Sequence, residues 1–293
     1  MVFAFKSRSG VSSQVRAIVH EQVEKALSAT VQAADIDKTV HALRRRCKRL
    51  RGMLRMVQPH FKDFAQQNTT IRDAADLLGG ARDARVMVET LDALVSDQAG
   101  HGAAGQAVAA RQFLVARLQR LSQDSDLAET LAQFSQTVGP LEASIAHWKF
   151  DQSGFELLGD GLQQTYGAFR TLAAEAEKHE SAAALHDWRK QTKYHGHHVA
   201  LLSQAAPDVL HARGNSLERL GEYLGDHHNL AVLGDTLHDG GLDDIGAIDM
   251  AIAARQHELA RLAFVLGRQL VVEKPAALRQ RFAGYWHLLP EED

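Results

Sequence analysis

Two segments of the chain carry histidine, arginine and lysine at a spacing suited to holding a polyanion. In the segment VHALRRRCKRL, basic residues recur every three or four positions, so that on an α-helix they would stack along one edge. Arginine donates paired hydrogen bonds to phosphate, and lysine adds a mobile point charge. We expect anion binding by the basic residues of this segment and of its continuation to residue 57, which are His41, Arg44, Arg45, Lys48, Arg51 and Arg55. We expect the same of the segment that begins at Leu185, with His186, Arg189, Lys190, Lys193 and His197.

The first segment carries its charges without local compensation. Arg44 and Lys48, and likewise Arg51 and Arg55, lie at positions i and i+4, where like charges destabilise a helix by about 0.2–0.5 kcal/mol per pair. No Asp or Glu occurs in the stretch 39–61. A bound polyanion would relieve this repulsion, although a solvated helix face or carboxylates from another helix would also do so.

The second basic segment is part of an internal repeat. LHDWRKQTKYH aligns with VHALRRRCKRL, and further along the chain YLGDHHNLAVLGDTL aligns with LLGGARDARVMVETL at nearly the same offset. His41 therefore corresponds to His186, and Arg82 corresponds to His228. Two matching segments in the same order indicate two copies of one helical unit. We divide the chain into two related halves, residues 1–146 and 147–293.

Arg82 and His228 are further candidates for the anion site. Each is followed by a polar residue, Asp83 or Asn229, that could orient it. A salt bridge within one helix or between two helices is an equally compatible role for Asp83.

Composition and periodicity predict an all-α fold. The chain has 293 residues, is 45% hydrophobic and contains only five prolines, and its apolar residues recur at helical spacing. Two related halves of this kind are expected to pack with pseudo-symmetry. The expected helices are 11–27, 40–57, 71–95, 108–121, 155–178, 181–204, 212–237, 245–270 and 275–286, with interruptions at 35–37, 58–60, 100–105 and 139–140.

Charge and cysteine content exclude several classes of protein. The formal net charge is −3, so an anion site must arise from local clustering. Cys47 is the single cysteine, which excludes an intrachain disulfide and cysteine-rich zinc sites. No stretch approaches the roughly 20 apolar residues of a membrane helix, and the N-terminal segment lacks the apolar core of a signal peptide. We expect a cytoplasmic protein with no membrane partner.

Taken together, these motifs resemble the CHAD family, the conserved histidine α-helical domain. HALR at His41 and HDWR at His186 match its histidine signature, each followed by a lysine, and LGGARD and LGDHHN match a second family element. The resemblance covers nearly the whole chain. It implies two pseudo-symmetric four-helix bundles, binding of inorganic polyphosphate along a central basic groove, and a location at polyphosphate granules. Polyphosphate-metabolising enzymes are the protein partners that it suggests.

The second half departs from the family pattern after Lys193. Residues 194–198 read YHGHH where the family continues with a basic, leucine-containing stretch. Anion binding, metal binding and a purely structural role are all compatible with these histidines. Histidine has an unperturbed pKa of about 6.5. Binding that involves the four histidines of the expected site should therefore strengthen as pH falls.

Two other functions are compatible with parts of the sequence. The 16 histidines, clustered at 195–198 and 227–228, could hold zinc in a histidine-based metalloenzyme, but no HExxH motif occurs. A cationic groove also attracts nucleic acid, yet aromatic residues for base stacking are not interleaved with the basic edge, so specific nucleic-acid binding is not expected. No nucleophile elbow, phosphate loop or paired-carboxylate motif is present. We expect a binding protein without catalytic residues, metal or cofactor.

The two halves should contribute unequally to polyphosphate binding. The first basic edge continues with two further arginines, whereas the second continues with small uncharged residues. Replacing Arg44 and Lys48 together with alanine should therefore weaken binding more than replacing Arg189 and Lys193. Titration calorimetry would measure the two losses, with circular dichroism as the check that helicity is unchanged. Equal losses would contradict the expected asymmetry.

Overall fold

The computed structural model describes residues 3–32, 36–97, 104–124, 127–242 and 244–291, and these residues form helices and connecting turns without a β-strand. The predicted all-α class is confirmed. Short 3-10 turns, η1 (Gln58–His60) and η2 (Ser203–Ala205), follow α2 and α8. The helices are α1 (Val11–Val31), α2 (Ile36–Val57), α3 (Phe64–Asp76), α4 (Gly80–Asp97), α5 (Ala104–Asp124), α6 (Leu127–Ile145), α7 (Glu156–His179), α8 (Ala182–Leu202), α9 (Pro207–Asp239), α10 (Gly246–Leu270) and α11 (Pro275–Trp286).

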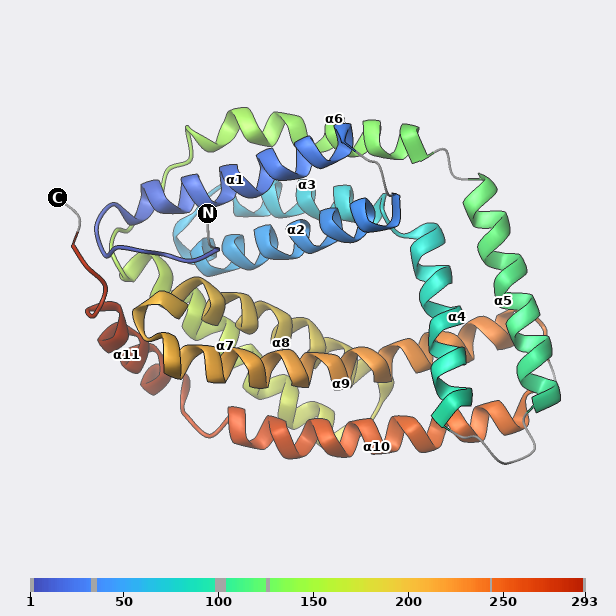
Figure 1. Cartoon of the computed structure of the whole chain (residues 1–293). Coiled ribbons are helices and arrows are strands. Elements are labelled where there is room, and N and C mark those ends of the chain that lie inside the picture. Colours follow the sequence, from blue (N-terminus) through green and yellow to red (C-terminus); the bar gives the residue numbers. More distant parts are fainter. Residues whose placement is uncertain (1–2, 33–35, 98–103, 125–126, 243, 292–293) are drawn as a thin grey trace.

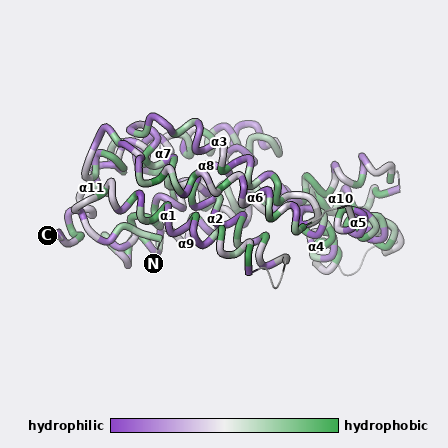
Figure 2. Tube along the Cα trace, turned by 90° about the horizontal axis from the view of Figure 1, so that it is seen from above, coloured by the Kyte–Doolittle hydropathy of each residue, from purple (hydrophilic) through white to green (hydrophobic). Residues whose placement is uncertain are grey.

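Four helices of the first half form one bundle. α1 and α3 each pack against both α2 and α6, so that the four helices close a ring around an apolar interior (Figure 1). The stripe on α2 that includes Leu43, Cys47, Leu50 and Leu54 recurs every three or four residues and is buried there. Figure 2 shows hydrophilic and hydrophobic positions alternating in the same way along the other helices.

The second half forms a similar ring. α7 packs on α8, α8 on α9, and α9 on α10, while α10 returns to α7. α11 covers one end of this bundle by packing on α7 (Figure 1). The N-terminal segment crosses to this half, where the Phe5 amide donates to the carbonyl of Leu201 at 2.8 Å and the Arg8 amide donates to that of Pro290 at 3.0 Å.

The helices α4 and α5 leave the first bundle and cover the far end of the second. They pack on one another and on α9 and α10 (Figure 1). A separate apolar cluster forms there, with Leu91 from α4, Leu114 from α5, Leu233 from α9 and Ile248 from α10. The two halves of the chain are therefore interlocked at this end of the molecule.

The helix α2 makes the central contact between the bundles, because it packs on both α7 and α8. Glycines permit the close approach. A Cβ at Gly161 of α7 would lie 2.0 Å from the carbonyl oxygen of Met56, and Nε2 of His198 donates to the carbonyl of Gly52 at 3.0 Å. The larger apolar cluster draws side chains from both halves. The expected boundary at 146/147 falls just after α6, but one continuous core crosses it.

Two expected details of the helices are wrong. The long helix expected over 71–95 is broken between α3 and α4, because Gly80 adopts a left-handed conformation with φ of 40°. The interruption expected at Gly139 and Pro140 is absent, and α6 runs through it. Gly139 has no Cβ to clash with the proline ring that follows. The expected break at 100–105 lies largely outside the described residues, whereas the last two residues of the expected break at 35–37 are the first two of α2.

Substituting Gly161 with alanine should destabilise the protein strongly. The new Cβ would meet the backbone of α2, which cannot rotate away as a side chain could. We expect the free energy of unfolding to fall by about 3 kcal/mol, the upper part of the range for overpacked sites. Chemical denaturation would measure it.

Gly284 of α11 offers a matched control, since nothing lies within 4 Å of its Cβ position. Alanine at Gly284 should be neutral or stabilising by about 0.5–1 kcal/mol, because alanine is the better helix former. Equal stability of the Gly161→Ala variant and the parent protein would contradict the proposed close contact between α7 and α2.

Candidate functional site

The two predicted basic edges meet at the contact between the bundles. Arg44 and Lys48 lie on α2, Arg189 and Lys193 on α8, and Arg82 in the first turn of α4. We call these five residues the central cationic cluster. Desolvation, followed by repulsion from the other four cations, lowers the pKa of Lys48 from 10.5 to about 8, although its side chain keeps an exposed surface. The strongest charged neighbours of Lys48 are therefore all cations.

The joint between α3 and α4 holds Arg44 in place. Its Nη1 donates to the carbonyl of Leu78 at 3.0 Å, and its Nη2 lies 3.3 Å from a carboxylate oxygen of Asp83. Gly79 leaves space for this arrangement, since its missing Cβ would lie 3.2 Å from the Asp83 carboxylate. Of the roles that the sequence allowed for Asp83, the structure shows a salt bridge between helices, with Arg44 as the partner in place of Arg82.

A pocket of about 260 Å³ opens between α2 and this joint. Arg44, Lys48 and Arg51 line it from α2, and Asp76 lines it from the end of α3. Cys47 also borders the pocket, but burial raises the pKa of its thiol to about 12. The thiol is therefore protonated at neutral pH and is not a nucleophile there.

Arg51 and Arg55 extend the basic edge toward the C-terminal end of α2. The guanidinium of Arg55 lies 4.5 Å from the ring centroid of Tyr194, and that of Arg51 lies 5.9 Å from it. Nε of Arg51 donates to the side-chain oxygen of Asn68 at 3.1 Å. The sequence analysis missed Tyr194 and Asn68, because their proximity to α2 depends on how α8 and α3 pack.

Three of the predicted histidines surround the cluster and are predominantly neutral at pH 7. The rings of His186 and His228 are in contact, with centroids 4.2 Å apart. Desolvation, then repulsion from His186 and Arg189, lowers the pKa of His228 to about 4. Desolvation also lowers the pKa of His186, and that of His41, where Arg82 is the strongest charged neighbour. His41 thus lies near Arg82 in the first half, just as the aligned residues His186 and His228 lie together in the second half.

His197 does not join the cluster. Its ring packs against Gly52 of α2 and lies edge-on to Phe3, with ring centroids 6.3 Å apart. Desolvation, followed by repulsion from His198, lowers the pKa of His197 to about 3. This geometry gives His197 a packing role, in place of the anion-binding role expected from its position on the helix. The histidines with a pKa of 3 to 4 do not titrate between pH 5.5 and 8.

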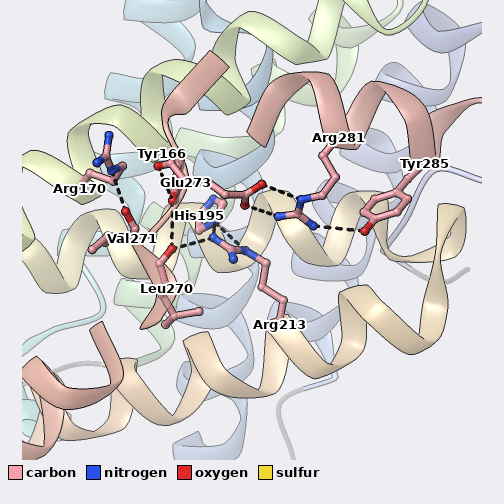
Figure 3. A network of polar contacts seen from close by, with 9 residues as sticks. All are labelled: Tyr166, Arg170, His195, Arg213, Leu270, Val271, Glu273, Arg281 and Tyr285. Carbon is pink, nitrogen blue, oxygen red and sulfur yellow. Dashed lines mark hydrogen bonds and ion pairs between the residues drawn. The ribbon is translucent and has the colours of Figure 1, made fainter. Parts of the chain in front are cut away.

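His195 lies on the buried side of α8, within the polar network of Figure 3. The guanidinium of Arg213 donates to Nε2 of His195 at 3.1 Å and to the carbonyl of Leu270 at 3.2 Å. A guanidinium can only donate, so Nε2 carries no proton and the imidazole is neutral. The hydroxyl of Tyr166 also donates to Leu270 at 3.1 Å.

The network continues into the turn between α10 and α11. Arg281 pairs with the carboxylate of Glu273 and donates to the hydroxyl of Tyr285, while Arg170 donates to the carbonyl of Val271 at 2.9 Å (Figure 3). These contacts fix the back of α8 and α9. They support α8, which carries Arg189 and Lys193, without lining the central cationic cluster.

Arg45 and Lys190 lie at the margins of the predicted site. Lys190 is half exposed and pairs with Asp187 at 2.5 Å. Arg45 is exposed and has Arg46 and Arg49 as charged neighbours. The structure does not bring either residue into the central cationic cluster.

Two further findings bear on the alternative functions. In the described part of the chain, no three His, Cys, Asp or Glu side chains are placed to hold a metal ion. None of the described helices combines the length and the apolar character that crossing a bilayer requires. The histidine clusters at 195–198 and 227–228 consist mainly of buried side chains whose pKa is lowered by desolvation.

Comparison with known proteins gives a consistent result. A family model described as the CHAD domain matches residues 17–238. The fold resembles the structure titled "PptA from Streptomyces chartreusis", with a TM-score of 0.65, 15% identity, and 90% of this chain and 100% of that chain covered. It also resembles the CHAD domain from the plant Ricinus communis, with a TM-score of 0.62, 19% identity, and 97% and 95% covered. No curated protein matches the sequence significantly.

Lys48 should make anion binding depend on pH above neutrality. A bound polyphosphate would raise the pKa of Lys48 above its free value of about 8. Its contribution is then fully present below pH 8 and is lost as pH rises from 8 through the pKa of the bound state. Calorimetry with long-chain polyphosphate from pH 7 to pH 10, at constant ionic strength, would measure this decline.

A Lys48→Arg variant is the control, because arginine stays charged over this range. Its affinity should vary much less between pH 8 and pH 10. The same decline in the variant and in the wild type would contradict a role for Lys48 in this pH dependence.

Proposed function

Because this chain belongs to the CHAD domain family, we propose that it binds inorganic polyphosphate in the groove between α2 and α8. The central cationic cluster is the observation that carries the proposal. Side chains from three helices, two of the first half and one of the second, bring their positive charges together around Lys48. Mutual repulsion makes this arrangement costly in the free protein, and a chain of linked phosphates would remove that cost.

The shape of the site suits a thin, continuous anion. The cations lie on helices from both bundles, so a single compact phosphate would meet only some of them. A linear chain could pass from the pocket beside Arg44 and Arg51 to Arg189 on α8. Arginine forks and the Lys48 ammonium together supply many donors for phosphate oxygens.

The role is one of binding, without catalysis. Cys47 is held as a protonated thiol, and the rings of His186 and His228 pack against each other. We place the protein at polyphosphate granules in the cytoplasm. There it would meet polyphosphate-metabolising enzymes as partners.

Binding should weaken steeply as salt increases. If the groove neutralises about six phosphates, the double-logarithmic slope of affinity against salt should be about −4, by analogy with about −0.7 per phosphate for single-stranded nucleic acid. The Arg44→Ala/Lys48→Ala variant should flatten the slope by about 1.4, since it removes two contacts. Fluorescence titration between 50 and 300 mM salt would test both values. A flat response in the wild type would refute the proposal.

Competition with RNA addresses the alternative function. At fixed salt, single-stranded RNA of equal phosphate number should displace labelled polyphosphate poorly, because the described groove offers few aromatic faces for bases. Tyr194 is one such face, but Arg55 already stacks on it. Equal displacement by RNA would favour a general nucleic-acid binder.

A further inference from the structure

Two cations of the second half lie along the surface of α9. A Cβ at Gly221 would lie 2.7 Å from Nζ of Lys193, and one at Gly225 would lie 3.5 Å from Nε of Arg189. Gly221 and Gly225 are four residues apart, so they share one face of the helix. Their missing side chains leave a track in which Lys193 and Arg189 lie close to the α9 backbone.

Beside this track, α9 carries three carboxylates. Glu218, Glu222 and Asp226 are each four residues apart, and all three are exposed. Like charges at this spacing repel one another in a helix, so nearby cations are needed to stabilise them. All three are among the strongest charged neighbours of Lys193, and Asp226 is the strongest for Arg189. We call these three residues the acidic edge of α9.

The first half lacks an equivalent edge. The aligned positions of the repeat are Arg72, Asp76 and Gly80, so only one carboxylate remains. Asp83 pairs with Arg44, but the strongest charged neighbours of Lys48 are all cations. The charge of Lys48 is therefore available to a ligand, whereas α9 supplies carboxylates to its counterpart Lys193.

We propose that the acidic edge neutralises Arg189 and Lys193 in the free protein and makes them available only to a polyphosphate chain already anchored on the first half. The inference rests on the proposed function and extends it to the class of ligand. A short oligophosphate binds the cations of α2, and it gains little binding free energy by displacing the carboxylates from Arg189 and Lys193. A long chain continues from its anchor and competes with them at high local concentration. Glu218, Glu222 and Asp226 are thus specificity-determining residues that favour long chains.

The test compares the wild type with a neutral-edge variant, Glu218→Gln/Glu222→Gln/Asp226→Asn. Affinity for inorganic triphosphate should rise roughly tenfold, because removing three exposed like charges lets a short anion bind Arg189 and Lys193 directly. The salt slope for triphosphate should become steeper by about 1.4, because two more cations engage phosphate. Long-chain polyphosphate, which already reaches both cations in the wild type, should gain roughly threefold or less.

A double-mutant cycle provides the decisive measurement. Replacing Arg189 and Lys193 with alanine should cost roughly tenfold more affinity for triphosphate in the neutral-edge background than in the wild type, because the acidic edge masks these cations from a short anion. Equal costs in the two backgrounds would overturn the inference. Thermal unfolding of every variant would confirm that the isosteric substitutions leave the fold intact.

A matched control separates the local effect from net charge. Glu24→Gln/Glu142→Gln/Glu175→Gln changes the net charge by the same amount, with the exposed Glu24 on α1, the partly buried Glu142 on α6 and the exposed Glu175 on α7. It should leave the salt slope unchanged. An equal gain in this control would also overturn the inference. If the wild type shows no saturable binding of long-chain polyphosphate, the proposed function itself fails.

Discussion

Close packing of α2 against α7 and α8 is the constraint on which the rest of this structure depends. Gly161 allows the backbones of α7 and α2 to approach, and His198 donates to the carbonyl of Gly52 across the contact with α8. This approach brings Lys48 close to Lys193 in a setting where like charges repel. The apolar core that runs through both bundles supplies the free energy that offsets this repulsion. The central cationic cluster can therefore exist in a protein whose net charge is −3.

The buried histidines of α8 act as neutral polar side chains. His195 accepts from Arg213, and His198 donates to Gly52, so each ring is held in one tautomer by a buried partner. Desolvation and neighbouring cations lower the pKa of each ring, which keeps further positive charge out of the core. The YHGHH stretch thus stabilises the helix crossing, and the permanent positive charge of the central cationic cluster comes from arginine and lysine.

The repeat produces two halves with different electrostatics because one helix is broken and its counterpart is continuous. Where α3 ends, backbone carbonyls no longer have helical partners, and the carbonyl of Leu78 accepts from Arg44. The corresponding part of α9 runs on without a break, so its glycine track and its row of carboxylates extend along one face. In the first half, Arg44 is therefore held at the C-terminal end of α3. In the second half, Arg189 and Lys193 lie against the side of α9.

Much of the fold and of the site could be predicted from the sequence. Helical periodicity defined most of the helices, since a buried apolar stripe must recur every three or four residues. The spacing of His41, Arg44 and Lys48, together with its second copy, indicated the two helices that carry the charge, because residues at that spacing share one helix edge. Local conformation was less predictable where one residue decides it, as at Gly80 and Pro140.

What the tertiary structure decided is which of these side chains meet and in what state of charge. The same helical edge that carries Lys193 also carries His197, yet the crossing with α2 places Lys193 beside Lys48 and packs His197 on Gly52. The pairing of Asp83 with Arg44, and of the α9 carboxylates with Lys193, joins residues far apart in the chain. The periodicity of the sequence shows which residues share one face of a helix. The burial and the charge state of a side chain depend on every helix packed around it. The packing of these helices is fixed only when the whole core forms.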